Sequence, residues 1–63
     1  MIRVTSLNNK EFYLNEDNIE KIEEVPDTVI TMSNDKKYLV KENIDEVMEK
    51  ILQFKRRYFD KLR

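Results

Sequence analysis

The stretch that decides the fold is residues 26–52, PDTVITMSNDKKYLVKENIDEVMEKIL. Its Pro26-Asp27 start predicts a turn, because proline presets φ at the first central position. β-branched and aromatic residues then favour two strands, at residues 28–32 and 37–41. An amphipathic helix follows the second strand after a very short connection. The stretch therefore predicts strands followed by a helix, which is an α+β arrangement.

The helix start is marked by Asn43, a good N-cap, and by Glu46 three residues later, as in a capping box. Apolar residues then recur at spacings of three and four, and we expect this stripe to pack on the sheet: Ile44, Val47, Met48, Ile51, Phe54 and Tyr58. We expect the C-terminal helix at residues 43–62, and its length from Ile44 to Leu62 would be roughly 28 Å. A five-residue strand covers only about 17 Å. The last two turns should therefore extend beyond the sheet.

Two segments, residues 4–14 and 30–40, resemble each other and both predict a strand, a turn and a strand. Asn8-Asn9 and Asn34-Asp35 can form the turns without glycine, because Asn and Asp tolerate the left-handed region. We favour three-residue loops with a bulge. Such loops set three facing pairs: Val4 with Phe12, Ile2 with Leu14, and Ile30 with Tyr38. The likeness fits either an internal duplication or the same turn chemistry used twice.

Between the hairpins, residues 18–25 allow a strand or, through the spacing of Ile19 and Ile22, one helical turn. We favour a strand at residues 21–25. The predicted fold is a small antiparallel β-meander of about five short strands over residues 1–41, followed by the long C-terminal helix.

A chain of 63 residues forms one domain, over residues 1–63, and buries only about 60% of its unfolded surface. It contains no Cys and no His, so neither a disulfide nor a structural zinc is expected to support it. Self-association is the remaining common support, and we expect a homo-oligomer. The sequence has no leader-like start and no apolar run long enough to cross a bilayer, so we expect a cytoplasmic protein.

Charge is distributed unevenly along the chain. Residues 1–49 carry 6 Lys or Arg against 12 Asp or Glu, whereas residues 50–63 carry 6 against 1. Part of this asymmetry opposes the helix macrodipole. The rest predicts a basic tail that meets an acidic protein surface, an anionic membrane face or a neighbouring subunit.

The basic tail also carries aromatic residues, and we assign it as the candidate protein-interaction surface: Phe54, Lys55, Arg56, Arg57, Tyr58, Phe59 and Leu62. Three uses are open for its apolar residues. They fold back on the domain's own edge, pair with another copy, or contact another molecule.

The sequence offers little for catalysis. Ser6 and Ser33 lack any histidine base, and paired carboxylates such as Glu23-Glu24 need unlike environments in a pocket before they act as acid and base. A calcium loop and a phosphate loop both need glycine, and the chain has none. We expect no enzyme activity, no catalytic, cofactor-binding or metal site, and no small-molecule substrate.

Four blocks resemble the FlbD family, also called SwrD, of small bacterial flagellar and swarming-motility proteins: residues 7–15, 19–23, 26–31 and 36–42. The PDTVIT block at residues 26–31 is the most specific, and the resemblance reaches about residue 55. The family usually has Asn-Gly at both hairpin turns, where this chain has Asn8-Asn9 and Asn34-Asp35.

The resemblance implies a non-enzymatic role in flagellar motility through protein–protein interaction. It implies support of motor output through the stator units, which convert ion flow into torque, at the inner face of the membrane near the motor. Peripheral contact with the membrane surface fits the same location.

The alternative is a nucleic-acid-binding regulator, because the strands, the capped helix and Lys36-Lys37 also resemble part of a LytTR-type domain. Phosphate binding needs several clustered cations, and the sheet portion is net acidic. The charge distribution therefore argues against this alternative.

Overall fold

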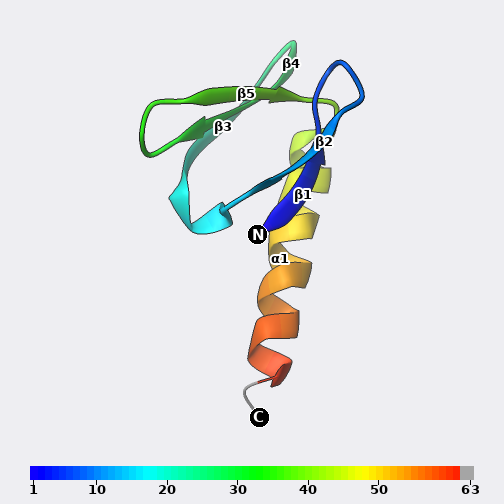
Figure 1. Ribbon diagram of the computed structural model, residues 1–63, viewed down its shortest axis with the longest axis vertical. Helices are drawn as coiled ribbons and strands as arrows, with labels where there is room; N and C mark the ends of the chain where they lie inside the picture. Colours follow the sequence, from blue (N-terminus) through cyan, green and yellow to red (C-terminus); the bar gives the residue numbers. More distant parts are fainter. Residues whose placement is uncertain (62–63) are drawn as a thin grey trace.

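The computed structural model describes the backbone of residues 1–61 and the side chains of residues 1–57. Its elements follow in this order: β1 (Ile2–Thr5), β2 (Glu11–Leu14), the 3-10 helix η1 (Glu16–Asn18), β3 (Ile19–Val25), β4 (Asp27–Met32), β5 (Lys37–Val40) and α1 (Ile44–Lys61) (Figure 1). The predicted α+β class, with five short antiparallel strands before one C-terminal helix, is confirmed.

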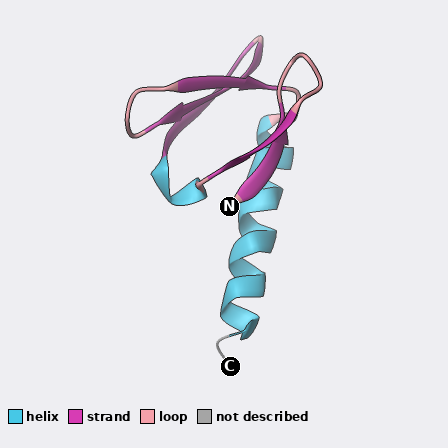
Figure 2. Cartoon of the chain, in the orientation of Figure 1, coloured by secondary structure: helices cyan, strands magenta, loops and turns pink. Residues whose placement is uncertain are grey.

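The five strands form two sheets, β1-β2 and β3-β4-β5. The pairing stops between β2 and β3, where η1 turns the chain (Figure 2). We did not predict η1; its signal is Asn15, whose side chain accepts a hydrogen bond from the Asp17 N–H at 3.1 Å. A bridge between Ser6 and Val40 joins the sheets, so they enclose one core.

Both hairpins have the predicted register. Val4 faces Phe12, Ile2 faces Leu14 and Ile30 faces Tyr38. The loops span residues 7–9 and 33–35, closed by N–H···O bonds of 2.8 Å from Ser6 to Lys10 and from Met32 to Lys36. The third loop residue takes the left-handed conformation in each, with φ of 69° at Asn9 and 67° at Asp35. These are three-residue loops with the bulge that the sequence predicts.

β3 is longer than predicted, because it begins at Ile19 rather than at Lys21. The pairing with β4 is irregular between these two residues. Val25 pairs with Asp27, so Pro26 alone separates the strands and Asp27 belongs to β4 instead of the turn. Proline suits this position because it has no N–H to leave unpaired.

The core consists of seven buried apolar side chains among the described residues: Ile2, Val4, Leu14, Ile30, Met32, Val40 and Val47. Strand residues reach it from alternate positions, as the period of two requires. Of these seven residues, Val47 is the one from the described part of α1, and α1 contacts β1 and β3.

α1 packs through a narrower stripe than predicted. Val47 is buried, and Ile44 and Ile51 are half-buried, but Met48 is 51% exposed and Phe54 is also exposed. Our expectation that Met48 packs on the sheet is wrong, because Met48 lies about 100° around the helix from Val47. The predicted overhang is confirmed, since α1 runs well past both sheets in Figure 1.

Candidate protein-interaction surface

The predicted interaction residues from Phe54 to Phe59 lie in the C-terminal half of α1. The side chains of Tyr58 and Phe59, and all of Leu62, fall outside the described residues. Phe54, Lys55, Arg56 and Arg57 are described and exposed. A helix turns 100° per residue, so these four side chains leave α1 in different directions. They do not form a single surface.

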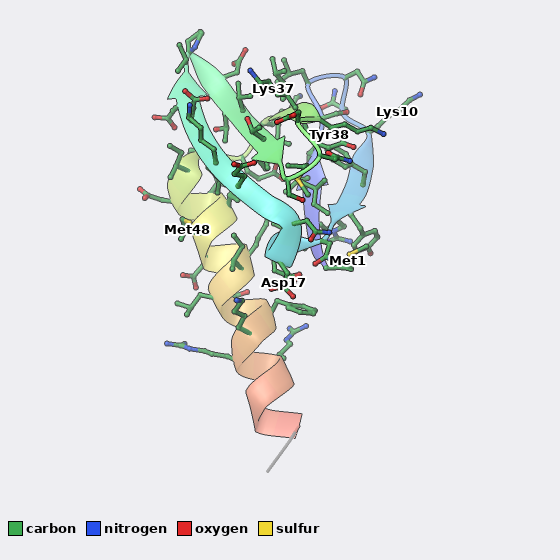
Figure 3. All side chains as sticks on the ribbon, turned by 90° about the vertical axis from the view of Figure 1, so that its left-hand side faces the viewer. Met1, Lys10, Asp17, Lys37, Tyr38 and Met48 are labelled. Atoms are coloured by element: carbon green, nitrogen blue, oxygen red, sulfur yellow. The ribbon has the colours of Figure 1, made fainter. Side chains whose placement is uncertain are left out.

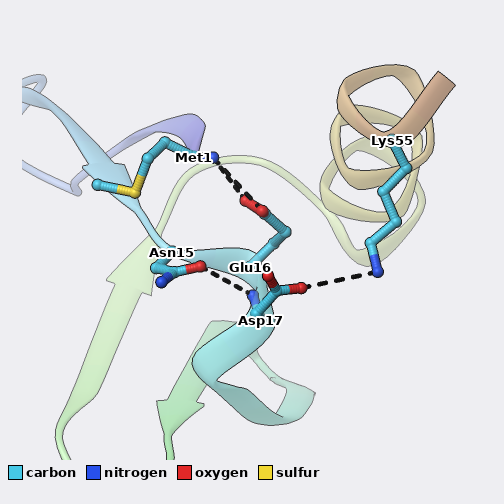
Figure 4. A network of polar contacts seen from close by, with 5 residues as sticks. All are labelled: Met1, Asn15, Glu16, Asp17 and Lys55. Atoms are coloured by element: carbon cyan, nitrogen blue, oxygen red, sulfur yellow. Dashed lines mark hydrogen bonds and ion pairs between the residues drawn. The ribbon is translucent and has the colours of Figure 1, made fainter. Parts of the chain in front are cut away.

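Lys55 faces η1. Its ammonium Nζ lies 3.8 Å from a carboxylate oxygen of Asp17, a contact that links the middle of α1 to the bend between the sheets (Figure 4). Both side chains are exposed, so the pair adds little stability. It does orient Lys55 toward its own domain, which removes Lys55 from the surface formed by Phe54 and Arg57.

Phe54 and Arg57 line an open hollow of about 270 Å³ between the N-terminal hairpin and the second half of α1. We call this hollow the basic groove, and its lining is Met1, Ile2, Arg3, Tyr13, Lys50, Gln53, Phe54 and Arg57. Three of these residues, Arg3, Lys50 and Arg57, have cationic side chains, and none is Asp or Glu. The groove is therefore the place in the described structure where the basic tail meets a shaped, partly aromatic surface.

The alternation of side chains along β1 and β2 and the three-and-four spacing of residues along α1 place the lining residues of the basic groove. Arg3 and Tyr13 face each other across β1 and β2, on positions that alternate with the buried Ile2, Val4 and Leu14. Lys50, Phe54 and Arg57 are spaced by four and three residues, so they share one face of α1.

Sequence reasoning missed six of the eight residues that line the groove: Met1, Ile2, Arg3, Tyr13, Lys50 and Gln53. The spacing from Lys50 to Arg57 was a usable signal. Arg3 and Tyr13 gave none, because only the packing of α1 on β1 brings them beside the helix.

The charge of the groove suits a carboxylate ligand. Guanidinium groups bind carboxylates through paired N–H donors, and Lys adds a point charge. Arg3 already has one acidic neighbour, because its Nε lies 3.5 Å from a carboxylate oxygen of Glu11. Both members of that pair are largely exposed, so a partner's carboxylate can compete for Arg3 at small cost.

Glu16 holds one wall of the groove in place. The Met1 amino nitrogen lies 2.6 Å from Glu16 Oε1, and the Glu16 side chain is only 4% exposed (Figure 4). Burial by itself raises the pKa of Glu16. The hydrogen bond from the Met1 ammonium group, a bond from the backbone and the charges of Met1 and Lys55 outweigh burial, so the Glu16 pKa lies below its ordinary value. Glu16 thus stays ionised and keeps Met1 at the groove edge.

Two other kinds of site are not seen in the part of the chain that the structure describes. No helix there is both long and apolar enough to cross a membrane. Within the same residues, no three His, Cys, Asp or Glu side chains gather closely enough to hold a metal ion.

Comparison with known proteins gives one family. No curated protein and no solved structure shows significant similarity to the chain. The model of the FlbD family, described as flagellar and swarming motility proteins, matches residues 1–59 of the 63. The turn residues that depart from the usual Asn-Gly, Asn9 and Asp35, still adopt positive φ, so the departure leaves the fold intact. The chain belongs to the FlbD family of flagellar and swarming motility proteins.

Proposed function

We propose that this chain supports flagellar motor output by binding an acidic segment of a motor component, with the stator units as the target. The basic groove is the binding site, and binding is non-enzymatic. The observation that carries this proposal is the lining of the groove, which includes Arg3, Lys50 and Arg57 and contains no Asp or Glu. Membership of the FlbD family supplies the process, which is flagellar and swarming motility.

The chemistry of the groove favours a protein partner. Tyr13 and Phe54 add aromatic surface to the three cations, and aromatic residues and arginine are enriched at protein interfaces. An acidic peptide segment offers carboxylates for Arg3 and Arg57 and an apolar side chain for Phe54. We place the interaction in the cytoplasm, at the inner face of the membrane near the motor.

The test uses a photocrosslinking amino acid at Gln53, which lines the groove. The variant is expressed in motile cells in place of the natural chain, and crosslinked proteins are identified by mass spectrometry. We expect a stator protein. Charge reversal of Arg57 to Glu in the same protein should remove the crosslink, because it places a carboxylate against the partner's carboxylates.

The matched control reverses Lys36 to Glu, an equal charge change at an exposed residue in the loop between β4 and β5. Its crosslink from position 53 should persist. Crosslinks only to non-motor proteins would contradict the proposal. Salt-dependent binding of duplex DNA by the purified chain, lost in Arg57→Glu, would contradict it in favour of nucleic-acid binding.

A further inference from the structure

We infer that a second copy of this chain covers another face of α1, the side of Met48 and Leu52, and that the two helices pair antiparallel there. This surface, which we call the Met48-Leu52 seam, is separate from the basic groove. In Figure 3, Met48 lies on the side of α1 away from Met1, and Met1 borders the groove.

The seam is apolar and uncovered. Met48 and Leu52 are 51% and 48% exposed, whereas Val47 and Ile51, the residues just before each of them, turn toward the chain's own core. α1 therefore carries two apolar stripes, and its own sheets use only one. Charged residues, Asp45 and Lys55, flank the two apolar residues on the same side of α1, so the four positions are spaced three, four and three, which is the spacing of a helix–helix seam.

The charges along α1 fix the orientation. Residues 44–52 carry Asp45, Glu46 and Glu49 against Lys50, and residues 53–61 carry Lys55, Arg56, Arg57 and Lys61 against Asp60. A parallel pair of helices would place like charges side by side. An antiparallel pair places the acidic half of each helix beside the basic half of the other. Such complementarity contributes modest energy but selects one orientation over the other.

One pair of positions makes this orientation testable. In a two-fold antiparallel pair, Met48 of each copy faces Leu52 of the other, so the two-fold axis lies level with Lys50. Asp45 and Lys55 are equally far from Lys50, one on each side of it along the helix. Asp45 of one copy then lies beside Lys55 of the other copy, and the contact occurs twice. Lys55 exchanges its exposed contact with Asp17, which contributes little, for this one.

The size of the core and the charges on α1 favour a second copy as the occupant. The core has only seven buried apolar side chains among the described residues, which is small for independent stability. The complementary charges also lie on the same helix as the seam, so an identical partner satisfies them without another protein.

The first test is sedimentation of the full chain, with Leu52→Lys compared with Leu39→Lys. Leu39 is a matched control because it is 45% exposed and lies on β5, away from α1. We expect a dimer whose dissociation constant rises by roughly tenfold or more in Leu52→Lys, because an interfacial apolar side chain is lost. Leu39→Lys should leave the constant unchanged. Circular dichroism checks that both variants fold.

The second test is a charge exchange. Asp45→Lys alone and Lys55→Asp alone should each weaken the dimer, because each creates two like-charge contacts. The double variant should restore dimerisation to near the natural value.

Four outcomes would overturn the inference. They are a chain that stays monomeric up to roughly 1 mM, a dimer that Leu39→Lys disrupts instead of Leu52→Lys, a double charge variant that stays weak, and a monomer that binds phosphatidylglycerol vesicles through Leu52. The crosslink from position 53 reports on the basic groove alone, so its result is independent of these.

Discussion

Glu42 accepts two hydrogen bonds from Thr5, one from the backbone N–H and one from the hydroxyl group, each 2.9 Å long. The neighbouring Lys41 N–H donates to the Thr5 carbonyl oxygen at 2.8 Å. These bonds join the end of β1 to the residues that lead into α1. They set how the helix leaves the sheets, and therefore how Phe54 and Arg57 come to lie beside Arg3.

Stability should depend on pH through Glu42. Burial by itself raises the pKa of Glu42, but hydrogen bonds from Thr5 and from its own backbone, with the charge of Lys50, outweigh it and lower the pKa below the ordinary 4.5. A lowered folded-state pKa stabilises the fold above the unfolded-state value, and this stability is lost as pH falls through the folded-state pKa.

Urea unfolding at several pH values between about 3 and 7 measures this effect. The free energy of unfolding of the natural chain should fall as the solution becomes more acidic than about pH 4.5. Glu42→Gln should show a shallower fall, with the remaining slope partly from Glu16, whose pKa is also lowered. Equal slopes in the two proteins would be evidence against an ionised Glu42 in this contact.

The helix cap offers a direct stability test. The Glu46 N–H donates to the Asn43 side-chain oxygen at 2.8 Å, and the Asn43 N–H donates to Glu46 at 3.3 Å. Asn43→Ala should lower the free energy of unfolding by about 1 kcal/mol. Asn43→Asp keeps the acceptor and should lose much less. Equal losses in both variants would mean that the cap is not what stabilises the helix start.

The two left-handed turn residues predict a gain in stability. Asn9 and Asp35 hold positive φ without being glycine, which strains each backbone. Asn9→Gly and Asp35→Gly should each raise the free energy of unfolding by a few tenths to about 1 kcal/mol, after the entropy cost of glycine.

Asn8→Gly is the control for the turn prediction. The Asn8 side-chain oxygen accepts a hydrogen bond from the Lys10 N–H at 3.3 Å, and a second contact comes from the Ser6 hydroxyl. Glycine there removes both contacts and should lower the free energy of unfolding. A gain at position 8 equal to that at position 9 would contradict the turn geometry.

Local sequence patterns were enough to predict the hairpins and the cap. Loop length, strand alternation and the Asn43-Glu46 spacing each act within a few residues, so Val4 opposite Phe12 followed from the sequence alone. The helix stripe was less certain, because Val47 and Met48 are adjacent apolar residues and only packing decides which one is buried.

The basic groove could be predicted only in part. Phe54 and Arg57 were found because they lie in a basic, aromatic tail. Their neighbours Arg3 and Tyr13 are more than 40 residues away in sequence, and the packing of α1 against β1 brings them together. The same packing turns Lys55 toward Asp17. Phe54, Lys55 and Arg57 are neighbours in the sequence, but in the structure Lys55 points in a different direction from Phe54 and Arg57. The groove is completed instead by residues that are distant in the sequence, Arg3 and Tyr13.

The most direct measurement of the central claim is motor torque in cells that lack the natural chain and express one variant. Arg57→Glu should reduce torque and swarming to the level of the deletion, while the purified variant keeps the natural circular dichroism spectrum. Lys36→Glu should keep natural torque. Full torque with a folded Arg57→Glu chain, and equally with Arg3→Glu, would contradict a motor-binding role for the basic groove.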